Sequence, residues 1–471
     1  MKSLFTFFLC LVICFSSTAQ DKAKQIDDLL AFCYKKGLFN GTILVSDHGN
    51  VIYDKAWGYA DFAAQREMKT ESTFYLASVS KQFTCMAIMI LQEQGKLSYD
   101  DPLSKYFSDF PDYADQATLR HMMHHTSGIP DHYSLGLNNP GLKNKDVYDL
   151  LVQQDTLLFE PGAQYSYSNG AYTLLSMIVA KVSGQSFAQF MKANIFEPLG
   201  MTNTLVFDET NPTVTNRVVG HTAFGNTDDY QLFTTGAGGM FTTTGDLYKW
   251  DRALYTEKLV KQSTLAEAFE PTILNDGEVV NYGFGWNIQS DSLGKRVFHT
   301  GGMAGFRTFL YRDMINNSTV IMLTNKGGVF PLGPLATALN NILRGKAYEL
   351  PKIPITMPLY DLVEAGKLKR LGKTFHKLKK KKSDEYVISE NALNAMGYLL
   401  IKEEKLEAAK AIFKVNIEAF PESANTYDSY AEACYLLGQY DQARLNYQKS
   451  LKLDPENDNA VEMLAKIEQK G

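Results

Sequence analysis

The sequence predicts an α+β domain followed by an all-α helical module. Strand-like segments lie near residues 41–58 and 306–324, towards the two ends of the first 345 residues. The chain between them is mostly helix-like and loop-rich, and the C-terminal part repeats itself with a period of 34 residues. Strands at both ends with helices between them favour one sheet that both ends share, beside a helical lobe.

Two hairpins are expected to supply the strands of this sheet. In the first, apolar runs at 42–45 and 51–53 flank the turn-forming residues 47–50. In the second, residues 307–311 and 319–323 flank Asn316-Asn317. Short apolar runs around such turn residues are typical of β-hairpins.

A buried helix is expected immediately after Ser78. Its apolar side chains recur with helical spacing, and Gly95 stops it; they are Phe83, Met86, Ala87, Ile90 and Leu91. Ser78 and Lys81 are three residues apart at the head of this helix and project from one face. The helix N-terminus also places backbone N–H groups near the serine oxygen.

The C-terminal repeats are expected to be helix pairs. Pro421 and Pro455, which end successive units, are 34 residues apart, and small and large apolar residues recur at the same spacing. This pattern resembles the tetratricopeptide repeat. Units are expected at 390–421 and 424–455, with a closing helix after Asn457. Helices within 356–384 either extend the stack, or the module packs on the first domain.

The first residues are typical of a secretory signal peptide. A basic start, an apolar run from Leu4 to Phe15 and small residues up to Ala19 predict cleavage near Ala19 and a periplasmic or secreted protein. An uncleaved anchor and a lipoprotein at Cys14 are the alternatives. The predicted limits are signal peptide 1–19, catalytic domain 20–345, linker and helices 346–384, and repeats 385–471.

Composition excludes several other classes of protein. The formal net charge of −5 argues against a nucleic-acid partner. No later segment is long and apolar enough to be a transmembrane anchor once the signal peptide is removed. The mature chain keeps three scattered cysteines, an odd number without disulfide or zinc spacing: Cys33, Cys85 and Cys434.

Ser78 and Lys81 have the residue types and spacing of a nucleophile and its base. A serine hydroxyl attacks a carbonyl only when a neighbouring base removes its proton, and a lysine serves as that base only where burial keeps it neutral. Ser292 and Lys295 share the spacing but lie in a turn-like segment with no helix behind them. The spacing alone is therefore weak evidence.

Two further groups of residues are candidates for the active site. Tyr167 and Asn169, two apart in a segment expected to be an extended loop, face the same way; a phenol can relay a proton and an amide can hold a substrate carbonyl. His299-Thr300-Gly301-Gly302 precedes a strand. Glycines at a strand edge allow close approach of a substrate, and a free N–H there can complete an oxyanion hole.

In this order, the three groups resemble the serine β-lactamase and penicillin-binding-protein superfamily, in its class C and esterase branch. Further similar stretches are His125-Thr126-Ser127-Gly128, Pro198-Leu199-Gly200-Met201, Gly238-Gly239-Met240 and Tyr282-Gly283-Phe284-Gly285-Trp286. The resemblance covers residues 24–345 and implies a β-lactamase/transpeptidase-like fold.

The resemblance also implies roles for the three groups. Ser78 would form an acyl-enzyme with the substrate. Lys81 and Tyr167 would share the acid–base work, in an order left open. The N–H groups of Ser78 and Gly302 would form the oxyanion hole, and Asn169 would contact a substrate amide.

His299 departs from the family pattern, which usually has lysine there to help hold a substrate carboxylate. A mostly neutral histidine predicts weak β-lactam hydrolysis and favours an esterase or peptidase, including D-amino-acid-specific types. His299 assisting Tyr167 is a further hypothesis.

The function expected is hydrolysis of an ester or amide, for example in a peptidoglycan-derived or D-amino-acid peptide, without a cofactor. A small molecule or peptide would be the substrate, and the repeats would bind a protein partner or stabilise the catalytic domain. The alternatives are a penicillin-binding sensor that is acylated without efficient turnover, and a scaffold of repeats alone. A metal site at His121, His124 and His125 is the rival interpretation of those residues, because their spacing can bind a metal.

Overall fold

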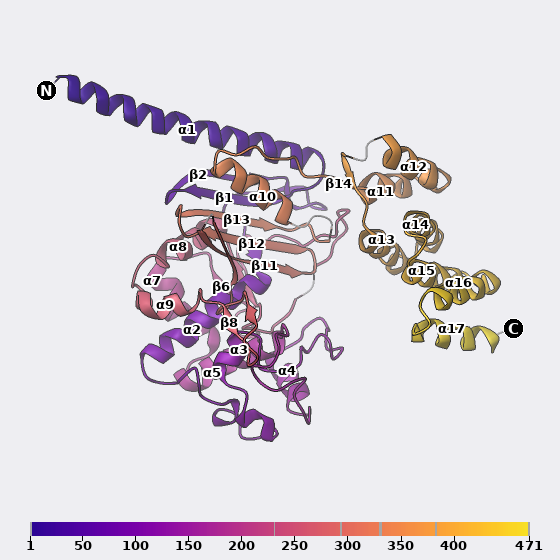
Figure 1. Ribbon diagram of the computed structural model, residues 1–471, viewed down its shortest axis with the longest axis horizontal. Helices are drawn as coiled ribbons and strands as arrows, with labels where there is room; N and C mark the ends of the chain where they lie inside the picture. The colour runs from indigo at the N-terminus through magenta and orange to yellow at the C-terminus, as the bar shows by residue number, and fades with distance from the viewer. Residues whose placement is uncertain (1, 230, 293, 329–331, 382–383, 470–471) are drawn as a thin grey trace. The chain divides into compact units, whose positions relative to one another are not determined.

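The chain forms two compact units, Met1–Leu350 (unit 1) and Pro351–Gly471 (unit 2), shown in Figure 1. The computed structural model describes residues 2–229, 231–292, 294–328, 332–381 and 384–469, with side chains from Ala19 onward. Among the side chains described, no helix combines the length and the apolar character that a membrane span needs.

Unit 1 is built on an antiparallel six-stranded sheet. The strands lie in the order β10-β11-β12-β13-β1-β2. Their bounds are β1 Gly41–Asp47, β2 Asn50–Trp57, β10 Asn287–Asp291, β11 Gly294–Met303, β12 Phe306–Asp313 and β13 Ser318–Thr324. Both predicted hairpins, β1–β2 and β12–β13, are therefore confirmed.

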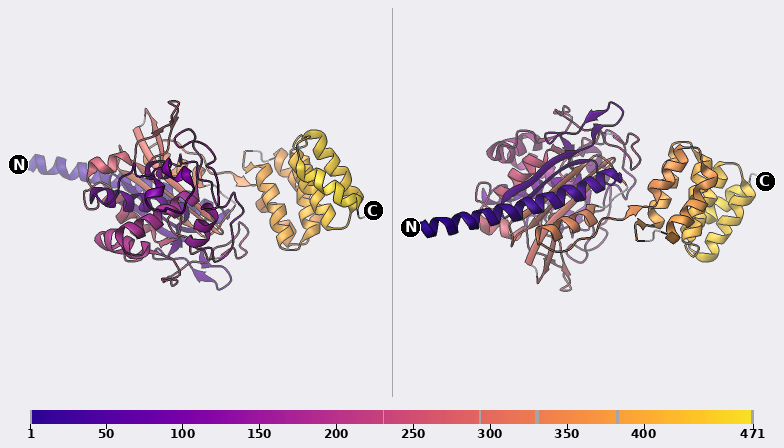
Figure 2. Two further views of the ribbon diagram at one scale, coloured as in Figure 1. Left: turned by 90° about the horizontal axis from the view of Figure 1, so that it is seen from below. Right: turned by 90° about the horizontal axis from the view of Figure 1, so that it is seen from above.

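The two hairpins share one sheet, as the sequence predicts, and they meet in its middle. β1 pairs with β13 from Gly41↔Thr324 to Ser46↔Thr319. Both strands are buried almost throughout, because helices cover both faces of the sheet. α1 (Lys2–Lys35) and α10 (Leu332–Leu343) lie on one face, and α8 (Thr244–Ala253) lies on the other with the helical lobe (Figures 1 and 2).

The helical lobe packs around α2 (Lys81–Glu93), the helix predicted after Ser78. The five predicted apolar residues of α2 are all buried. Phe83 stacks on Trp250 of α8, with ring centroids 4.1 Å apart. The other elements of unit 1's lobe and loops are η1 Ala77–Ser80, η2 Leu103–Lys105, η3 Asp112–Asp115, α3 Leu119–Met123, α4 Asn144–Leu151, α5 Asn169–Ser183, α6 Phe187–Met191, the π-helix η4 Lys192–Phe196, α7 Glu197–Leu199 and α9 Gln262–Glu267.

Short strand pairs complete unit 1. They are β3 Tyr59–Asp61 with β4 Arg66–Glu67, β5 Phe74–Tyr75 and β6 Leu205–Val206 with β7 Met240–Thr242, and β8 Thr272–Ile273 with β9 Val279–Val280. β5 lies just before Ser78 in the chain, and its pairing with β7 joins it to a segment far away in the sequence. Unit 1 is thus the α+β fold that the sequence predicts.

Unit 2 contains the predicted helix pairs. They are α13 Glu390–Lys402 with α14 Leu406–Ala419, and α15 Ala424–Leu436 with α16 Tyr440–Leu453, followed by the closing helix α17 Asp458–Glu468. Ala443 and Tyr447 are fully buried between the helices, as their recurrence at the repeat spacing suggests.

Two helices precede the repeats in unit 2. α11 (Thr356–Glu364) and α12 (Leu371–Lys381), joined by η5 (Leu368–Arg370), pack on α13 and α14 and extend the stack. A short parallel pair, β14 (Ile353–Pro354) and β15 (Tyr386–Val387), flanks them. α12 ends in three lysines, Lys379, Lys380 and Lys381.

Candidate active site

Ser78 lies in the short 3-10 turn η1 that leads into α2. Ala77, the residue before it, has a φ of +50°, a left-handed conformation that non-glycine residues rarely adopt. Such strain persists only where the surroundings enforce it. Here the turn lies against β11 and β12 and aims the Ser78 side chain into a cavity.

Lys81 is the first residue of α2 and is completely buried. Its ammonium donates to Ser78 Oγ (3.1 Å), Asn169 Oδ1 (2.8 Å) and the Ala237 carbonyl oxygen (2.9 Å). Burial lowers the pKa of Lys81 to about 7, and the charge of Asp131 opposes that shift. Near neutral pH a large share of Lys81 is therefore uncharged and able to accept the Ser78 proton.

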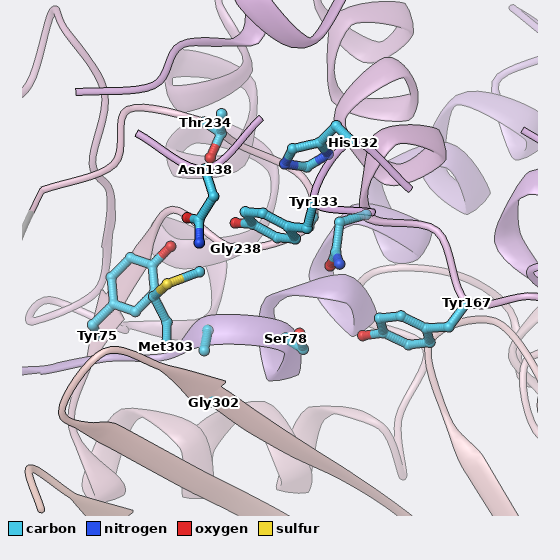
Figure 3. A pocket seen from close by; sticks show the side chains of 13 residues that line it. Tyr75, Ser78, His132, Tyr133, Asn138, Tyr167, Thr234, Gly238, Gly302 and Met303 are labelled. Atoms are coloured by element: carbon cyan, nitrogen blue, oxygen red, sulfur yellow. The ribbon is translucent and has the colours of Figure 1, made fainter. Parts of the chain in front are cut away.

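Tyr167 and Asn169 approach Ser78 and Lys81 from the start of α5. The expected extended loop is only partly correct: it ends at Ser168, whose side chain caps α5, and Asn169 is the first helical residue. The Tyr167 hydroxyl points to Ser78 (Figure 3). Lys81 Nζ lies 4.7 Å from the centre of the Tyr167 ring. Burial raises the pKa of Tyr167 above its usual value, so the phenol keeps its proton.

Asn169 has both ends of its side-chain amide engaged. Oδ1 accepts from Lys81, and Nδ2 donates to Asp131 Oδ2 at 3.1 Å. Asn169 also lines the cavity that contains Ser78. Its contact with a substrate amide stays a prediction.

The glycine-rich segment lies at the end of β11, shortly before β12 begins. β10 pairs with β11 only as far as Phe298, so among the described strands none pairs with that edge over residues 299–303. Gly301 packs against η1, since a Cβ there would come within 2.6 Å of the Leu76 carbonyl oxygen. Thr300 is exposed, and Gly302 lines the cavity.

His299 is buried and neutral. Burial lowers its pKa to about 3. Its Nδ1 is 2.6 Å from the Thr300 carbonyl oxygen and its Nε2 is 3.0 Å from the Tyr282 hydroxyl. Nδ1 therefore donates to the carbonyl, and Nε2 accepts from Tyr282. Tyr282, rather than Tyr167, therefore donates to the unprotonated nitrogen of His299. The hypothesis that His299 assists Tyr167 in proton transfer is not supported by this hydrogen bond.

The three neighbouring histidines point to different partners. His121 Nδ1 lies 3.0 Å from Thr118 Oγ1, His124 Nδ1 lies 3.1 Å from the Tyr282 carbonyl oxygen, and His125 accepts from the Ser168 N–H. His125 is fully buried, and this hydrogen bond ties it to the segment that leads into α5. Among the residues that the structure describes, no three potential metal ligands cluster.

The cavity in front of Ser78 has a volume of about 330 Å³ (Figure 3). Ser78, Tyr167, Asn169 and Gly302, all predicted site residues, line it together with side chains that sequence reasoning missed: Tyr75, His132, Tyr133, Asn138, Thr234 and Met303. Burial lowers the pKa of His132 to about 4, so it is neutral near pH 7. The described lining residues therefore carry no formal charge at that pH.

Asp131 is the most informative residue that sequence reasoning missed. It follows the His125-Thr126-Ser127-Gly128 stretch, and its carboxylate binds both the backbone and the side chain of Asn169. In the sequence, only its position just after this stretch indicates it. A single Asp in a loop does not indicate a functional role, because its role depends on the fold placing Asn169 beside it.

A strained turn that carries a serine, with a buried lysine beside it at the edge of an antiparallel sheet, defines a serine hydrolase of the β-lactamase type. The chain belongs to the beta-lactamase family, whose sequence profile matches residues 23–341. A tetratricopeptide-repeat profile matches residues 424–457, which confirms the repeat predicted at 424–455.

Individual relatives agree with this assignment. The chain is 34% identical to Penicillin-binding protein 4* of Bacillus subtilis (strain 168), over 71% of this chain and 79% of that protein. It is similar to the structure of the octameric penicillin-binding protein homologue from Pyrococcus abyssi, with a TM-score of 0.61 and 26% identity, over 68% of this chain and 78% of that one. The D-amino acid amidase from Ochrobactrum anthropi SV3 shares the fold, with a TM-score of 0.57 and 24% identity, over 65% and 92% of the two chains.

Proposed function

We propose that this protein is an exported serine hydrolase that cleaves an ester or an amide through an acyl intermediate on Ser78. The observation that carries the proposal is the 3.1 Å hydrogen bond between Ser78 Oγ and the buried amine of Lys81. Because burial brings the pKa of Lys81 to about 7, that amine can take the serine proton at neutral pH.

The acylation step uses groups that already surround Ser78. Ser78 Oγ attacks the substrate carbonyl while neutral Lys81 accepts its proton. The N–H groups of Ser78 and Gly302 stabilise the oxyanion. As the tetrahedral intermediate collapses, the bond to the leaving group breaks and the leaving group takes a proton, which Tyr167 can donate because its phenol stays protonated.

Deacylation reverses these roles. A water molecule attacks the acyl carbon and gives its proton to the Tyr167 phenolate that acylation leaves behind. The ester bond to Ser78 then breaks, and the serine oxygen recovers its proton from the Lys81 ammonium, which becomes neutral again. The acid product leaves and the enzyme returns to its starting state.

The uncharged cavity supports an esterase or peptidase rather than an efficient β-lactamase. His299, at the position where the family usually has lysine, is buried and neutral and hydrogen bonds to Tyr282. It therefore offers no positive charge to a substrate carboxylate. A peptidoglycan-derived or D-amino-acid peptide fits the polar, neutral lining.

The second candidate is a penicillin-binding sensor, favoured by the similarity to Penicillin-binding protein 4*. In that case the acyl group would stay on Ser78, and unit 2 would recruit a protein partner through its repeats. Repeat stacks of this kind commonly bind peptides on their concave side.

The proposal includes cleavage of a signal peptide near Ala19 and a periplasmic or secreted location. The apolar run and small residues at 4–19 support it. Cleavage there would keep the face of α1 that packs into the core, whose buried side chains among those described are Ile26, Leu29, Leu30 and Cys33. N-terminal sequencing of the protein secreted by its native host tests this point.

The function is tested with protein that starts at Gln20, beside Ser78→Ala and Lys81→Ala variants. Each is incubated with a fluorophosphonate and a fluorescent penicillin, and p-nitrophenyl ester turnover is measured in parallel. Ester turnover that Ser78→Ala abolishes, with a weak penicillin reaction, supports the hydrolase. Penicillin that labels Ser78 and stays there supports the sensor, and failure of every probe to label the folded protein contradicts both.

A further inference from the structure

Asp131 holds Asn169 by two hydrogen bonds. Its Oδ1 accepts from the Asn169 backbone N–H, and its Oδ2 accepts from the Asn169 side-chain Nδ2, both at 3.1 Å. The Asp131 side chain is only 17% exposed. Both oxygens of one shielded carboxylate are thus engaged by a single residue, at the point where α5 starts.

This pairing fixes which way the Asn169 amide points. A carboxylate only accepts hydrogen bonds, so the NH₂ end of the amide must face Asp131. The carbonyl end then faces Lys81, where Oδ1 lies 2.8 Å from Nζ. An acceptor at this distance stabilises the charged form of Lys81.

Asp131 also acts on Lys81 through its own charge. The other titratable groups around Lys81 are neutral near pH 7, because burial lowers the pKa values of the histidines and raises those of the thiol and the phenols: His125, His132, His299, Cys85, Tyr167 and Tyr172. Among the described residues that act on Lys81, Asp131 is the carboxylate that opposes the effect of burial.

We propose that Asp131 is a positioning residue of the Ser78 site, which sets the orientation of the Asn169 amide and the charge on Lys81. The inference deepens the proposed function, because it assumes that Lys81 is the base for Ser78. Asp131 touches no reacting atom. It acts through Asn169 and through its charge, and so determines the pH range in which the base is neutral.

Two variants separate charge from shape. Asp131→Asn removes the charge and allows the Asn169 amide to turn over, so that its NH₂ faces Lys81 and favours the neutral amine. The double variant Asp131→Asn/Asn169→Asp exchanges the two groups. The new amide at position 131 would still accept from the backbone N–H through its oxygen, and its nitrogen would donate to the new carboxylate at position 169. That carboxylate would contact Lys81 directly.

The two variants are expected to shift Lys81 in opposite directions. The titration midpoint of Lys81 falls by roughly one pH unit in Asp131→Asn, and rises above the wild-type midpoint in the double variant. Lysine-¹⁵N NMR reads the midpoint directly, with Lys81→Ala to assign the signal. The acid limb of kcat/KM for a p-nitrophenyl ester follows the same order. Asp149→Asn, at a half-exposed aspartate paired with Lys145, is the matched control and leaves both unchanged.

The outcomes distinguish this inference from the proposed function. Midpoints that do not move, or that move in the same direction in both variants, overturn the role of Asp131. If Asp131→Asn does not fold, the double variant decides alone, because its polar groups remain paired. If the midpoints move as expected while no acyl probe labels Ser78, the role of Asp131 stands and the hydrolase proposal fails.

Discussion

Gly301→Ala is expected to displace β11 from the turn that carries Ser78. A Cβ on Gly301 would lie 2.2 Å from Thr308 Oγ1, 2.6 Å from the Leu76 carbonyl oxygen and 3.1 Å from Ala77 Cβ. The Thr308 hydroxyl cannot simply rotate away without cost, because it donates to that same Leu76 oxygen at 2.7 Å. The strand must therefore shift.

The size of the shift follows from these contacts. Ordinary carbon–oxygen contacts are roughly 3.3–3.6 Å, so the backbone has to separate by about 0.7–1 Å. A displacement of that size at a reacting centre costs about 10²-fold in rate, and overpacking of this kind costs roughly 1–3 kcal/mol of stability. Because the Gly302 N–H moves with the strand, we expect acylation to slow about 100-fold.

The assay is the rate of fluorophosphonate labelling of Ser78, with the unfolding midpoint in urea measured beside it. Gly302→Ala keeps its N–H and places its Cβ at an ordinary 3.5 Å from Arg307 Cδ, so its labelling rate should fall much less than that of Gly301→Ala. Gly333→Ala in α10 controls for stability, because among the described residues no atom outside its chain neighbours and its own helix backbone lies within 4 Å of the new Cβ. If Gly301→Ala labels as fast as Gly302→Ala, the close packing of β11 on η1 does not position the oxyanion hole.

Other perturbations address the base, the core and unit 2. Because burial sets the pKa of Lys81 to about 7 and its neutral form is the base, kcat/KM for an ester should rise with pH and reach half its plateau near pH 7; a rate that is flat from pH 5 to 9 would exclude this base. Asp251→Ala should destabilise the protein by roughly 3–5 kcal/mol in urea unfolding, since it leaves the buried Arg312, 2.6 Å away, without its carboxylate; a loss below about 1 kcal/mol would refute this account of the pair. A chain ending at Leu350 should stay folded and keep its ester turnover, because the main hydrophobic cluster of unit 1, from Leu44 to Leu323, and the helices α1 and α10 that cover its sheet all precede that residue; lost activity would show that unit 2 stabilises unit 1.

The sequence predicts the sheet and the repeats well because both depend on local patterns. The period of apolar residues identifies α2, and turn residues between apolar runs identify both hairpins. The helix pairs of unit 2 follow from a spacing that recurs. In each case the pattern that predicts the element lies in the residues that form it.

The site is less predictable, because its decisive contacts join segments far apart in the chain. Asp131 binds Asn169 across 38 residues, and Tyr282 takes the free nitrogen of His299. The left-handed Ala77 has no local signal, since alanine normally avoids that conformation. The start of α5 at Asn169 depends on Ser168 as its cap, whereas the residue types alone also suit an extended loop.

The pairing of β1 with β13 has a consequence for how the protein is made. The middle of the sheet joins Gly41 to Thr324, so β1 is synthesised long before its partner. Until then, one edge of the β1–β2 hairpin is open to pairing with other chains. Contacts between residues so distant in sequence also make folding slow. Unit 1 can therefore close its sheet only once the chain has been made past β13, and a shorter nascent chain must stay unfolded or be protected.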